Sequence, residues 1–503
     1  MSVALIVPGS PLLSQMSHAA WKTAMLMPPL GLVQLAGYLR ANGVETTIID
    51  AVRRPMDPQR CAQALIELSP RLIGFSVLTW NYCFTVQTVK ALRRGGWGGA
   101  IVFGNIHAAV FRERILSEGW ADYVVVGEGE RPLLELARRI EAGQSGVGIP
   151  GVISAVQINE LCNGPSLLVE NLDELPLPDW SLIDIGWYLD RRLPIAREAL
   201  LPICASRGCR FNCSFCSQEK YVPRFRHRSV AGLIGEIERD LCEFDTHGLA
   251  FLDAAFPWSE EFGIEFCDTL VKTGLDRRIG WWCETRADVV TPRLLKSMVR
   301  AGCRHILYGF ESGEPRMLLA MNKGLTVERS LKAAAWTREA GLPFHAFLII
   351  GYPGETIGSA LRTIRLALRL RPTTAKFHLA MPMPGSRFYQ DVKHLLKIDL
   401  SDPQSAAGFT SWNNWSLHLG RPVFVPAGMS ARTLQALYWL AHLLFYGRPW
   451  KIVSLLRSGQ MRASSLWYAG LVLVEGMLHR GSHKEMDCQE GRSPEEETRR
   501  AEQ

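Results

Sequence analysis

The sequence has no apolar run long enough to cross a membrane. A spanning helix needs about 20 consecutive apolar residues, whereas the two apolar stretches near the carboxyl end, at 434–446 and 466–478, are shorter, and Gly447-Arg448-Pro449 interrupts the first of them. The first residues also lack the basic, apolar and small-residue succession of a secretory signal. We therefore expect a cytoplasmic protein rather than a secreted or integral membrane protein.

A strong excess of one charge is also missing. The 56 lysines and arginines nearly balance the 49 aspartates and glutamates, and the formal net charge of +7 is spread along 503 residues. Short basic pairs such as Arg53-Arg54 and Arg93-Arg94 are typical of solvated faces rather than of nucleic-acid grooves. We therefore expect no nucleic-acid partner. The hydrophobic content of 47% is enough for two or three buried cores.

The 12 cysteines are irregularly spaced, and one cysteine motif has no partner motif nearby. Cys209-Arg-Phe-Asn-Cys213-Ser-Phe-Cys216 has C-x3-C-x2-C spacing, which brings three thiolates onto one loop. Zinc knuckles usually combine two C-x2-C pairs or add histidines, so zinc and purely structural thiols are the weaker alternatives. Three thiolates leave one iron of a four-iron cluster open to a further ligand. Such a site needs reduced thiols, which agrees with a cytoplasmic location.

This motif resembles the cluster-binding motif of the radical S-adenosylmethionine (SAM) superfamily. The resemblance implies a 4Fe–4S cluster whose open iron binds the amino and carboxylate groups of SAM. It also implies an external electron donor, such as flavodoxin or ferredoxin, and cleavage of SAM to a 5′-deoxyadenosyl radical. Phe211 and Phe215 lie between the cysteines, where they either limit solvent access to the cluster or anchor the loop in a core.

Alternating apolar strands and helices before the motif predict a doubly wound, Rossmann-like α/β domain over residues 1–148. Its parallel strands are expected at residues 2–7, 46–49, 72–77, 100–103 and 123–126. Ligands of such sheets bind at the carboxyl ends of the strands. The residues expected at that edge are Ser76, Thr79, Gly104, His107, Gly127 and Glu128.

In order and position, these residues resemble the cobalamin-binding domain that precedes the core of one radical SAM subfamily. That subfamily includes the anaerobic oxidative cyclase of bacteriochlorophyll biosynthesis and hopanoid and natural-product methyltransferases. The Asp-x-His-x-x-Gly motif of cobalt-coordinating domains is absent after the first strand, and His18 lies outside such a pattern. The resemblance therefore implies base-off cobalamin without a histidine ligand, with His107 as a hydrogen-bonding loop residue. Small residues at strand ends also have a purely steric explanation, in which the domain binds nothing.

Residues 149–195, rich in turn formers and acidic positions, are expected to form a linker. A second strand–helix alternation over residues 196–395 then predicts a partial (βα)6 TIM-type barrel. Its strands are expected at residues 200–204, 249–252, 279–284, 305–309, 346–351 and 377–381. Barrel enzymes place their chemistry after the strands, where this chain has Asp253, Arg286, Glu311 and Gly351.

SAM needs a cation for its carboxylate and acceptors for its ammonium and hydroxyl groups. By resemblance to the superfamily, Arg286 binds the carboxylate, Glu311 binds the ribose or amino end, and the strand at Gly351 contacts adenine. The alternative for Arg286 is an ordinary loop salt bridge with Asp288. Tyr308, His345, His378, Met381 and Met383 are expected either to line the substrate cavity or to pack in the core.

The chain departs from the superfamily pattern in two places. Asp253-Ala-Ala-Phe256 replaces the usual paired acids, and Ser217-Gln-Glu-Lys220 stands after the motif, where no Gly-Gly-Glu follows the cluster loop. Recognition of the SAM amino group therefore stays open. Arg224, Arg226 and Arg228 form a basic stretch that resembles one typical of the subfamily, with solvated positive charge as the alternative.

Residues 396–481 are expected to form a helical C-terminal domain, followed by a disordered polar tail at 482–503. Aromatic residues on its basic-flanked helices fit peripheral membrane contact, a cover over a hydrophobic substrate, or packing against the barrel. Taken together, the sequence predicts a cobalamin-dependent radical SAM enzyme, favouring methylation of an unactivated carbon in a small or lipid-like intermediate. The alternatives are an oxidative or ring-forming cyclase with the same cofactors and a non-catalytic cobalamin or redox sensor. No motif indicates the substrate or the oligomeric state.

Overall fold

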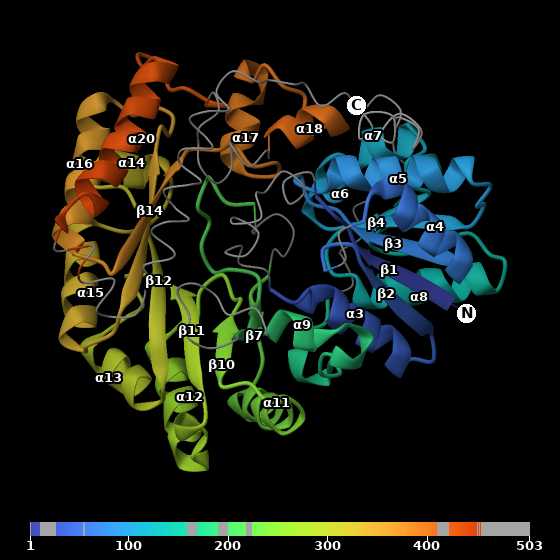
Figure 1. Cartoon of the computed structure of the whole chain (residues 1–503), viewed down its shortest axis with the longest axis horizontal. Helices are drawn as coiled ribbons and strands as arrows, with labels where there is room; N and C mark the ends of the chain where they lie inside the picture. Colours follow the sequence, from blue (N-terminus) through green and yellow to red (C-terminus); the bar gives the residue numbers. More distant parts are fainter. Residues whose placement is uncertain are drawn as a thin grey trace, which may run out of the picture.

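The first sheet has six strands in the order β2-β1-β3-β4-β5-β6, and it is built from the amino-terminal part of the chain (Figure 1). The first five strands run parallel, while β6 pairs antiparallel with β5. The bounds are β1 (Ser2–Val7), β2 (Glu45–Asp50), β3 (Leu72–Ser76), β4 (Ala100–Gly104), β5 (Tyr123–Val125) and β6 (Val152–Ser154). This computed structural model describes residues 2–10, 27–53, 56–157, 168–189, 200–217, 224–409, 422–449, 451 and 453.

Helices cover both faces of this sheet, which confirms the predicted doubly wound fold. Alternate strand residues divide between two cores: Val3 and Leu5 pack with α3 and α8, whereas Ala4 and Ile6 pack with α4 and α5. A side chain of a strand points to the opposite face from its neighbour, so buried runs such as 2–7 serve both layers. The helices are α3 (Leu30–Ala41), α4 (Pro58–Leu68), α5 (Tyr82–Arg94), α6 (Ile106–Val110), α7 (Arg112–Ser117) and α8 (Glu130–Glu141).

The second sheet is a six-stranded parallel sheet in the order β14-β13-β12-β11-β10-β7, which confirms the predicted partial barrel. Its strands are β7 (Leu200–Ile203), β10 (Gly248–Phe251), β11 (Gly280–Thr285), β12 (Cys303–Glu311), β13 (Phe344–Ile350) and β14 (Thr374–Leu379). Along β13, burial alternates with a period of two. Phe344, Ala346 and Leu348 are buried in the core that includes the outer helices, so His345, Phe347 and Ile349 point to the barrel interior.

Serine and threonine caps start the long helices of the barrel. The side chains of Ser229, Ser259, Thr291, Thr326 and Thr356 each accept a hydrogen bond from a backbone N–H in the first turn of the helix that follows. These caps fix where each connection ends and each helix begins. The helices are α11 (Val230–Glu243), α12 (Glu260–Thr273), α13 (Pro292–Arg300), α14 (Pro315–Ala320), α15 (Val327–Glu339) and α16 (Ile357–Leu370).

The linker packs between the two domains and contacts both. Its described part contains the 3-10 turns η2 (Leu172–Glu174) and η3 (Trp180–Leu182) and the helix α9 (Ile185–Leu189). Tyr188 donates a hydrogen bond of 2.6 Å to Asp50 at the end of β2, and Trp180 is buried in the core that α3 shares with the barrel. Strand β6 lies within the expected linker range but extends the first sheet; a strand of three residues is too short to show a period. The boundary at residue 148 stays a prediction.

A second crossing joins the domains after the barrel ends. The chain leaves α17 (Arg387–Val392) and returns to the first domain through α18 (Pro403–Phe409), whose Ala406 is fully buried in the core beside α5. Arg114 pairs with Asp399 at 2.7 Å along this path. The later helix α20 (Ala431–Tyr446) instead packs on β14, where the Tyr446 hydroxyl bonds to the backbone of Ala375. The two described helices of the C-terminal region thus cover different domains.

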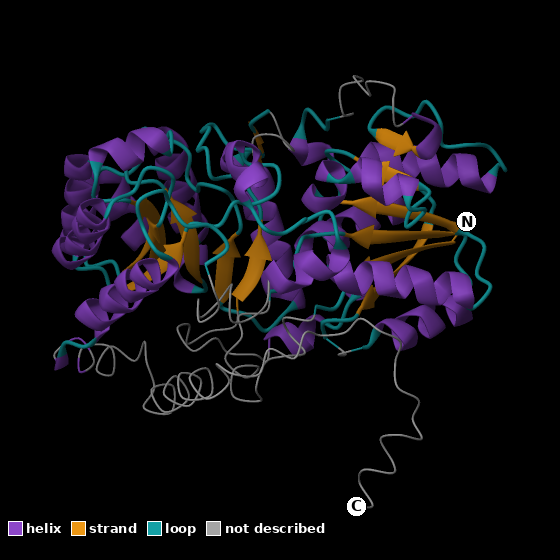
Figure 2. Ribbon diagram, turned by 90° about the horizontal axis from the view of Figure 1, so that it is seen from above, coloured by secondary structure: helices purple, strands orange, loops and turns teal. Residues whose placement is uncertain are grey.

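The carboxyl ends of the first sheet lie at the junction of the domains, because its strands point toward the barrel (Figure 2). Within the described part of the chain, every helix is too short or too polar to cross a bilayer. The predicted tail at 482–503 and the apolar run at 466–478 lie outside the described residues, as does His18.

Candidate active site between the two domains

The three cysteines lie on one loop that a short antiparallel ladder closes at its base. Strand β8 (Ser206–Arg207) precedes the loop and β9 (Arg226–His227) follows it. Gly208, with a φ of +81°, makes the left-handed turn into the loop. Cys209 and Cys213 are partly exposed, Cys216 is exposed, and none of them is in a disulfide. Three cysteines outside any disulfide on one loop are the donor set that the predicted cluster needs.

Backbone contacts hold the middle of this loop in place. Ser214 donates its N–H to Met321 at 2.9 Å and accepts the N–H of Phe388 at 2.7 Å. The hydroxyl of Ser214 also lies 2.8 Å from the hydroxyl of Tyr352. The loop is therefore fixed against the ends of α14 and α17 and against the turn after β13.

Two cations flank the central cysteine. Arg286 Nη1 lies 3.7 Å from Cys213 Sγ, and the Arg286 guanidinium stacks on Phe211 at 3.6 Å from the ring centre. Burial raises the pKa of the Cys213 thiol, while Lys323 and Arg286 act in the opposite direction. Positive charge beside a buried thiol favours its thiolate form, so these cations suit an anionic cluster.

Arg286 is held by several partners at once. Its guanidinium forms two hydrogen bonds of 2.9 Å with the Asp288 carboxylate, and Nη2 donates to the Lys323 carbonyl at 2.6 Å. The salt bridge that the sequence left as an alternative is therefore present. Binding of the SAM carboxylate by Arg286 stays a prediction, and it would have to share the guanidinium with Asp288.

Glu311 ends β12 and forms a buried ion pair with Lys323 at 2.8 Å. Burial lowers the pKa of the Lys323 ammonium, but Glu311 more than offsets this and holds the pKa above its usual range. A side chain at Gly309 would place Cβ 2.4 Å from Glu311 Oε1 and 2.9 Å from Lys323 Nζ, so this close pairing requires glycine. Glu311 itself has a φ of +62°, an uncommon conformation that suits a functional site.

Lys323 was not among the residues expected from the sequence. It lies in a loop after α14, where one lysine among many carries no motif. The sequence does contain Asn322-Lys323-Gly324, in which asparagine and glycine are residues that readily adopt positive φ. In the structure these two residues have φ values of 48° and 64°. Such a tight turn places a single side chain with high precision.

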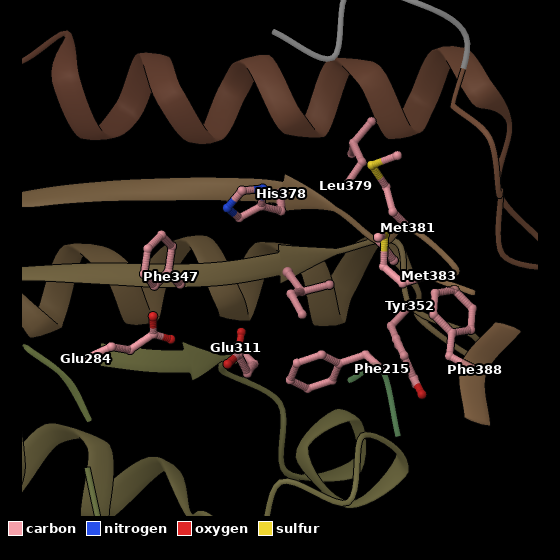
Figure 3. Close-up of a pocket in the computed structure, with 12 residues that line it drawn as sticks. Phe215, Glu284, Glu311, Phe347, Tyr352, His378, Leu379, Met381, Met383 and Phe388 are labelled. Atoms are coloured by element: carbon pink, nitrogen blue, oxygen red, sulfur yellow. The ribbon is translucent and has the colours of Figure 1, made fainter. Parts of the chain in front are cut away.

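A cavity of about 330 Å³ lies beside the cluster loop on the inner wall of the barrel (Figure 3). Glu284 and Glu311 point into it from one side, facing Phe347 and His378 on β13 and β14. The Glu284 side chain is exposed to the cavity, yet desolvation by the cavity walls raises its pKa to about 7, and the negative charge of Glu311 acts in the same direction. The cavity is lined by Phe215, Glu284, Glu311, Phe347, Ile349, Tyr352, His378, Leu379, Ala380, Met381, Met383 and Phe388.

His378, Met381 and Met383 therefore line the cavity as the sequence allowed, whereas Tyr308 and His345 lie elsewhere. Tyr308 faces the helices, and its buried hydroxyl bonds to Thr337 at 3.0 Å. His345 points inward near the start of β13, where Nδ1 bonds to Thr374 at 2.7 Å. Glu284, on β11 two residues before Arg286, also lines the cavity; no motif in the sequence marks it, because its place there depends on the assembled barrel.

Asp253 and Gly351 also lie after their strands, but each makes contacts within the protein. The Asp253 carboxylate accepts hydrogen bonds from Ala205 N at 3.0 Å and from the Ser206 hydroxyl, so it braces the entry to the cluster loop. Burial raises its pKa to about 6. Gly351 has a φ of +92°, and a Cβ there would lie 2.9 Å from Leu434 of α20. Its contact with adenine stays a prediction.

At the carboxyl edge of the first sheet, neutral side chains pair across adjacent strands. Asn105 Nδ2 donates to Ser76 at 3.1 Å, and His107 Nδ1 lies 3.1 Å from the Thr79 hydroxyl. A Cβ at Gly104 would meet none of the described residues within 4 Å, so among them the edge leaves room for a ligand at this point. These polar groups and this open backbone fit a flat cofactor.

His107 is buried between two aromatic rings at this edge. Its ring centre lies 4.1 Å from Tyr82 and 4.7 Å from Phe111, and burial lowers its pKa to about 3. The Nε2 atom is buried without a hydrogen-bond partner among the described residues. His107 is therefore neutral and enclosed, and it lies on α6 rather than in the predicted loop. That it does not bind cobalt stays a prediction.

Gly127 and Glu128 follow β5, and Glu128 contacts the barrel domain. Its carboxylate pairs with Arg226 and lies 3.5 Å from Arg207. Arg226 and Arg228 are thus buried and paired, contrary to the alternative of solvated charge, whereas Arg224 is exposed. Direct contact of Gly127 and Glu128 with a cofactor stays a prediction.

Comparison with known proteins supports both domains. The family "B12 binding domain" matches residues 19–137, and the "Radical SAM superfamily" matches residues 203–367. The chain is 30% identical over 366 residues to an uncharacterized methyltransferase of Pyrococcus horikoshii, covering 72% of this chain and 78% of the relative. It is 29% identical to the anaerobic magnesium-protoporphyrin IX monomethyl ester cyclase of Cereibacter sphaeroides, covering 74% of this chain but 61% of that enzyme.

Two solved structures share the fold. The methyltransferase TsrM of Kitasatospora setae, with cobalamin and a 4Fe–4S cluster bound, matches with a TM-score of 0.64 at 20% identity, covering 78% of this chain and 75% of that one. The radical enzyme OxsB, with aqua-cobalamin and SAM bound, matches with a TM-score of 0.66 at 16% identity, covering 95% of this chain and 80% of that one. On the two matched domains and the Pyrococcus horikoshii relative, the chain belongs to the family of cobalamin-dependent radical SAM enzymes.

Proposed function

We propose that the protein is a C-methyltransferase that acts on an unactivated carbon of a small, mainly apolar intermediate. The carrying observation is that the cavity adjoins the cluster loop on one side and, on the other, an apolar cluster that the barrel shares with the first domain. Phe215 of the cluster loop lines it on one side. On the other, Met381 and Met383 pack against the same apolar cluster as Phe111 of the first domain, and Phe111 contacts His107. A substrate held there would lie between two cofactor sites.

In this proposal, Cys209, Cys213 and Cys216 hold a 4Fe–4S cluster, and the edge at Ser76, Thr79 and Gly104 holds cobalamin. When bound, the cluster and SAM supply a carbon-centred radical, and cobalamin supplies the methyl group. A flavodoxin or ferredoxin type of donor would supply the electron. Glu311 would bind the ribose or amino end of SAM, and its ion pair with Lys323 keeps its carboxylate from adding net charge there.

In this proposal, the protein contributes a mainly apolar cavity that holds the substrate. Aromatic, aliphatic and thioether side chains make up most of the cavity lining, and such a lining disfavours water that would quench a reactive intermediate. Glu284, with a pKa of about 7, carries a proton on part of the molecules at neutral pH. Its carboxyl group can therefore donate a hydrogen bond to a polar substituent of the substrate or accept one from it.

The similarity to the magnesium-protoporphyrin cyclases supports a second candidate, an oxidative or ring-forming reaction with the same cofactors. Labelled SAM separates the two. Anaerobically reconstituted protein would be incubated with a reductant, a pool of candidate substrates and SAM labelled in its methyl group, and the products analysed by mass spectrometry. Label in the product supports methyl transfer. A new ring or an inserted oxygen without label supports the cyclase reaction, and binding of both cofactors without SAM cleavage supports a sensor.

A further inference from the structure

Four charged side chains connect the base of the cluster loop to the first domain. Arg207 on β8 and Arg226 on β9 are direct partners across the two-stranded ladder that closes the loop. Glu128 and Glu130 lie between β5 and the first turn of α8 in the first domain. We call these four residues the glutamate clamp. The clamp was not visible as a unit in the sequence, because Glu128 and Arg226 are 98 positions apart.

The clamp has the geometry of a rigid connection. Arg226 binds both oxygens of Glu128, with Nη1 at 3.0 Å from Oε2 and Nη2 in contact with Oε1. Arg207 Nη2 lies 2.6 Å from Glu130 Oε1. Bidentate pairing of a planar guanidinium with a carboxylate fixes orientation as well as distance.

Burial makes these contacts stiffer than surface salt bridges. The side chains of Glu128 and Arg226 are both 5% exposed. Burial would raise the pKa of the Glu128 carboxyl, but the hydrogen bond from Arg226 and the charge of Arg207 hold that pKa below its usual range. The linker completes the shell, because Val169 donates its N–H to Glu128 at 3.0 Å and accepts from Arg226 at 2.6 Å. Losing one partner would leave a buried charge uncompensated.

The clamp is close to the cluster along the chain. Cys209 follows Arg207 by two residues, a span of at most about 7 Å in an extended chain. A shift at Arg207 is therefore passed to the first cysteine over a very short stretch. On the other side, Gly127 and Glu128 belong to the same carboxyl edge as Ser76 and Gly104.

We propose that the glutamate clamp sets the distance between the cluster and cobalamin, so that Glu128 and Glu130 are positioning residues rather than cobalamin ligands. The inference rests on the proposed cofactor sites. Methyl transfer through two centres needs reacting atoms at about 3–3.5 Å, and a misplacement of about 1 Å can cost about 10²-fold in rate. A fixed spacing between the centres meets that requirement before the substrate binds.

The test measures the spacing itself. In protein loaded with both cofactors, pulsed electron paramagnetic resonance reports the coupling between the reduced cluster and Co(II), and hence the distribution of distances between them. We expect Glu128→Gln and Arg226→Lys to load both cofactors, as seen by their visible absorption, and to broaden or shift that distribution. The yield of product per 5′-deoxyadenosine should fall by about tenfold or more, in line with the cost of misplacement.

Arg224→Ala is the matched control. Arg224 lies in the same basic stretch and pairs with Glu170 at 2.8 Å, but the two side chains are 63% and 60% exposed. This variant should keep the parent distribution. Should Glu128→Gln fail to take up the cofactors, Glu130→Gln tests the clamp at its second contact, where the partner Arg207 is partly exposed.

The results distinguish failure of the proposed clamp from failure of the proposed function on which it rests. Parent protein that binds no cobalamin would overturn the proposed function and the clamp's role with it. Parent protein with both signals, combined with an unchanged distance distribution in the loaded variants, would overturn the clamp alone. A lowered melting temperature with unchanged spacing would count as this second result, because it shows that the four residues serve stability only.

Discussion

The carboxyl edges of the two sheets differ in the side chains that pair there. Charged side chains pair at the edge of the barrel sheet, whereas neutral side chains pair at the edge of the first sheet between β3 and β4. The barrel edge contains Arg286 with Asp288 and Lys323 with Glu311. The first edge contains hydroxyl, amide and imidazole groups that bond to one another. A zwitterionic ligand needs fixed opposite charges, while a large ligand on an open strand edge needs shape and neutral hydrogen bonds. The same strand-end geometry therefore supports two kinds of recognition.

Loss of the cluster should have the largest effect at the charged edge. Cys213→Ala should abolish the broad visible absorption of anaerobically reconstituted protein and all formation of 5′-deoxyadenosine, because two thiolates on the loop do not hold the cluster. Cys242→Ala, at an exposed cysteine of α11, should change neither. Full SAM cleavage by the Cys213 variant would remove the basis for placing the cluster on this loop.

The next largest effect is expected from Arg286, at the charged edge of the barrel sheet. Arg286→Ala should leave the cluster absorption in place and weaken SAM binding by about 2–5 kcal/mol, the usual cost of unpairing a buried charge. Asp288→Ala should weaken it far less if the guanidinium pairs with the SAM carboxylate. Equilibrium binding of SAM to both variants decides between the roles. Equal and small losses would show that Arg286 serves the loop salt bridge, and the carboxylate partner would lie elsewhere.

A smaller effect concerns pH. Desolvation by the cavity walls raises the pKa of Glu284 to about 7, above its ordinary value of 4.5. The folded protein therefore holds a proton that the unfolded chain releases, so this group's contribution to stability is present below pH 4.5 and is lost as the pH rises toward 7. Glu284→Gln should reduce the decline in stability across that window. Urea midpoints measured at several pH values check this, and parallel curves for parent and variant would contradict it.

The smallest expected change is at the neutral edge. Bound cobalamin should be base-off, and His107→Ala should keep that spectrum, because the imidazole is enclosed by Tyr82 and Phe111. A spectrum typical of histidine ligation that disappears in this variant would show that the ring leaves its aromatic cage to bind cobalt. The neutral edge would then contribute a coordinate bond.

The sequence predicted the features that depend on residues close together in the chain. Strands such as 2–7 and 344–350 have continuous or alternating apolar residues, and both are strands in the structure. The three-cysteine spacing likewise lies within eight residues. Contacts that depend on the assembled fold could not be predicted. Solvated charge is one of the alternatives that the sequence leaves open for Arg226, but its side chain is buried against Glu128. Lys323 pairs with Glu311 from a turn that no functional motif marks.

The return of α18 to the first domain has a consequence for engineering. Because Ala406 completes the core beside α5, and Arg114 and Tyr82 bond to the segment just before α18, the first domain is not contiguous in sequence. A chimera that exchanges only the amino-terminal part for that of a relative would leave this patch uncovered or mismatched. A successful graft would carry residues 393–409 along, so the unit of exchange, and of inheritance by recombination, is a discontinuous one.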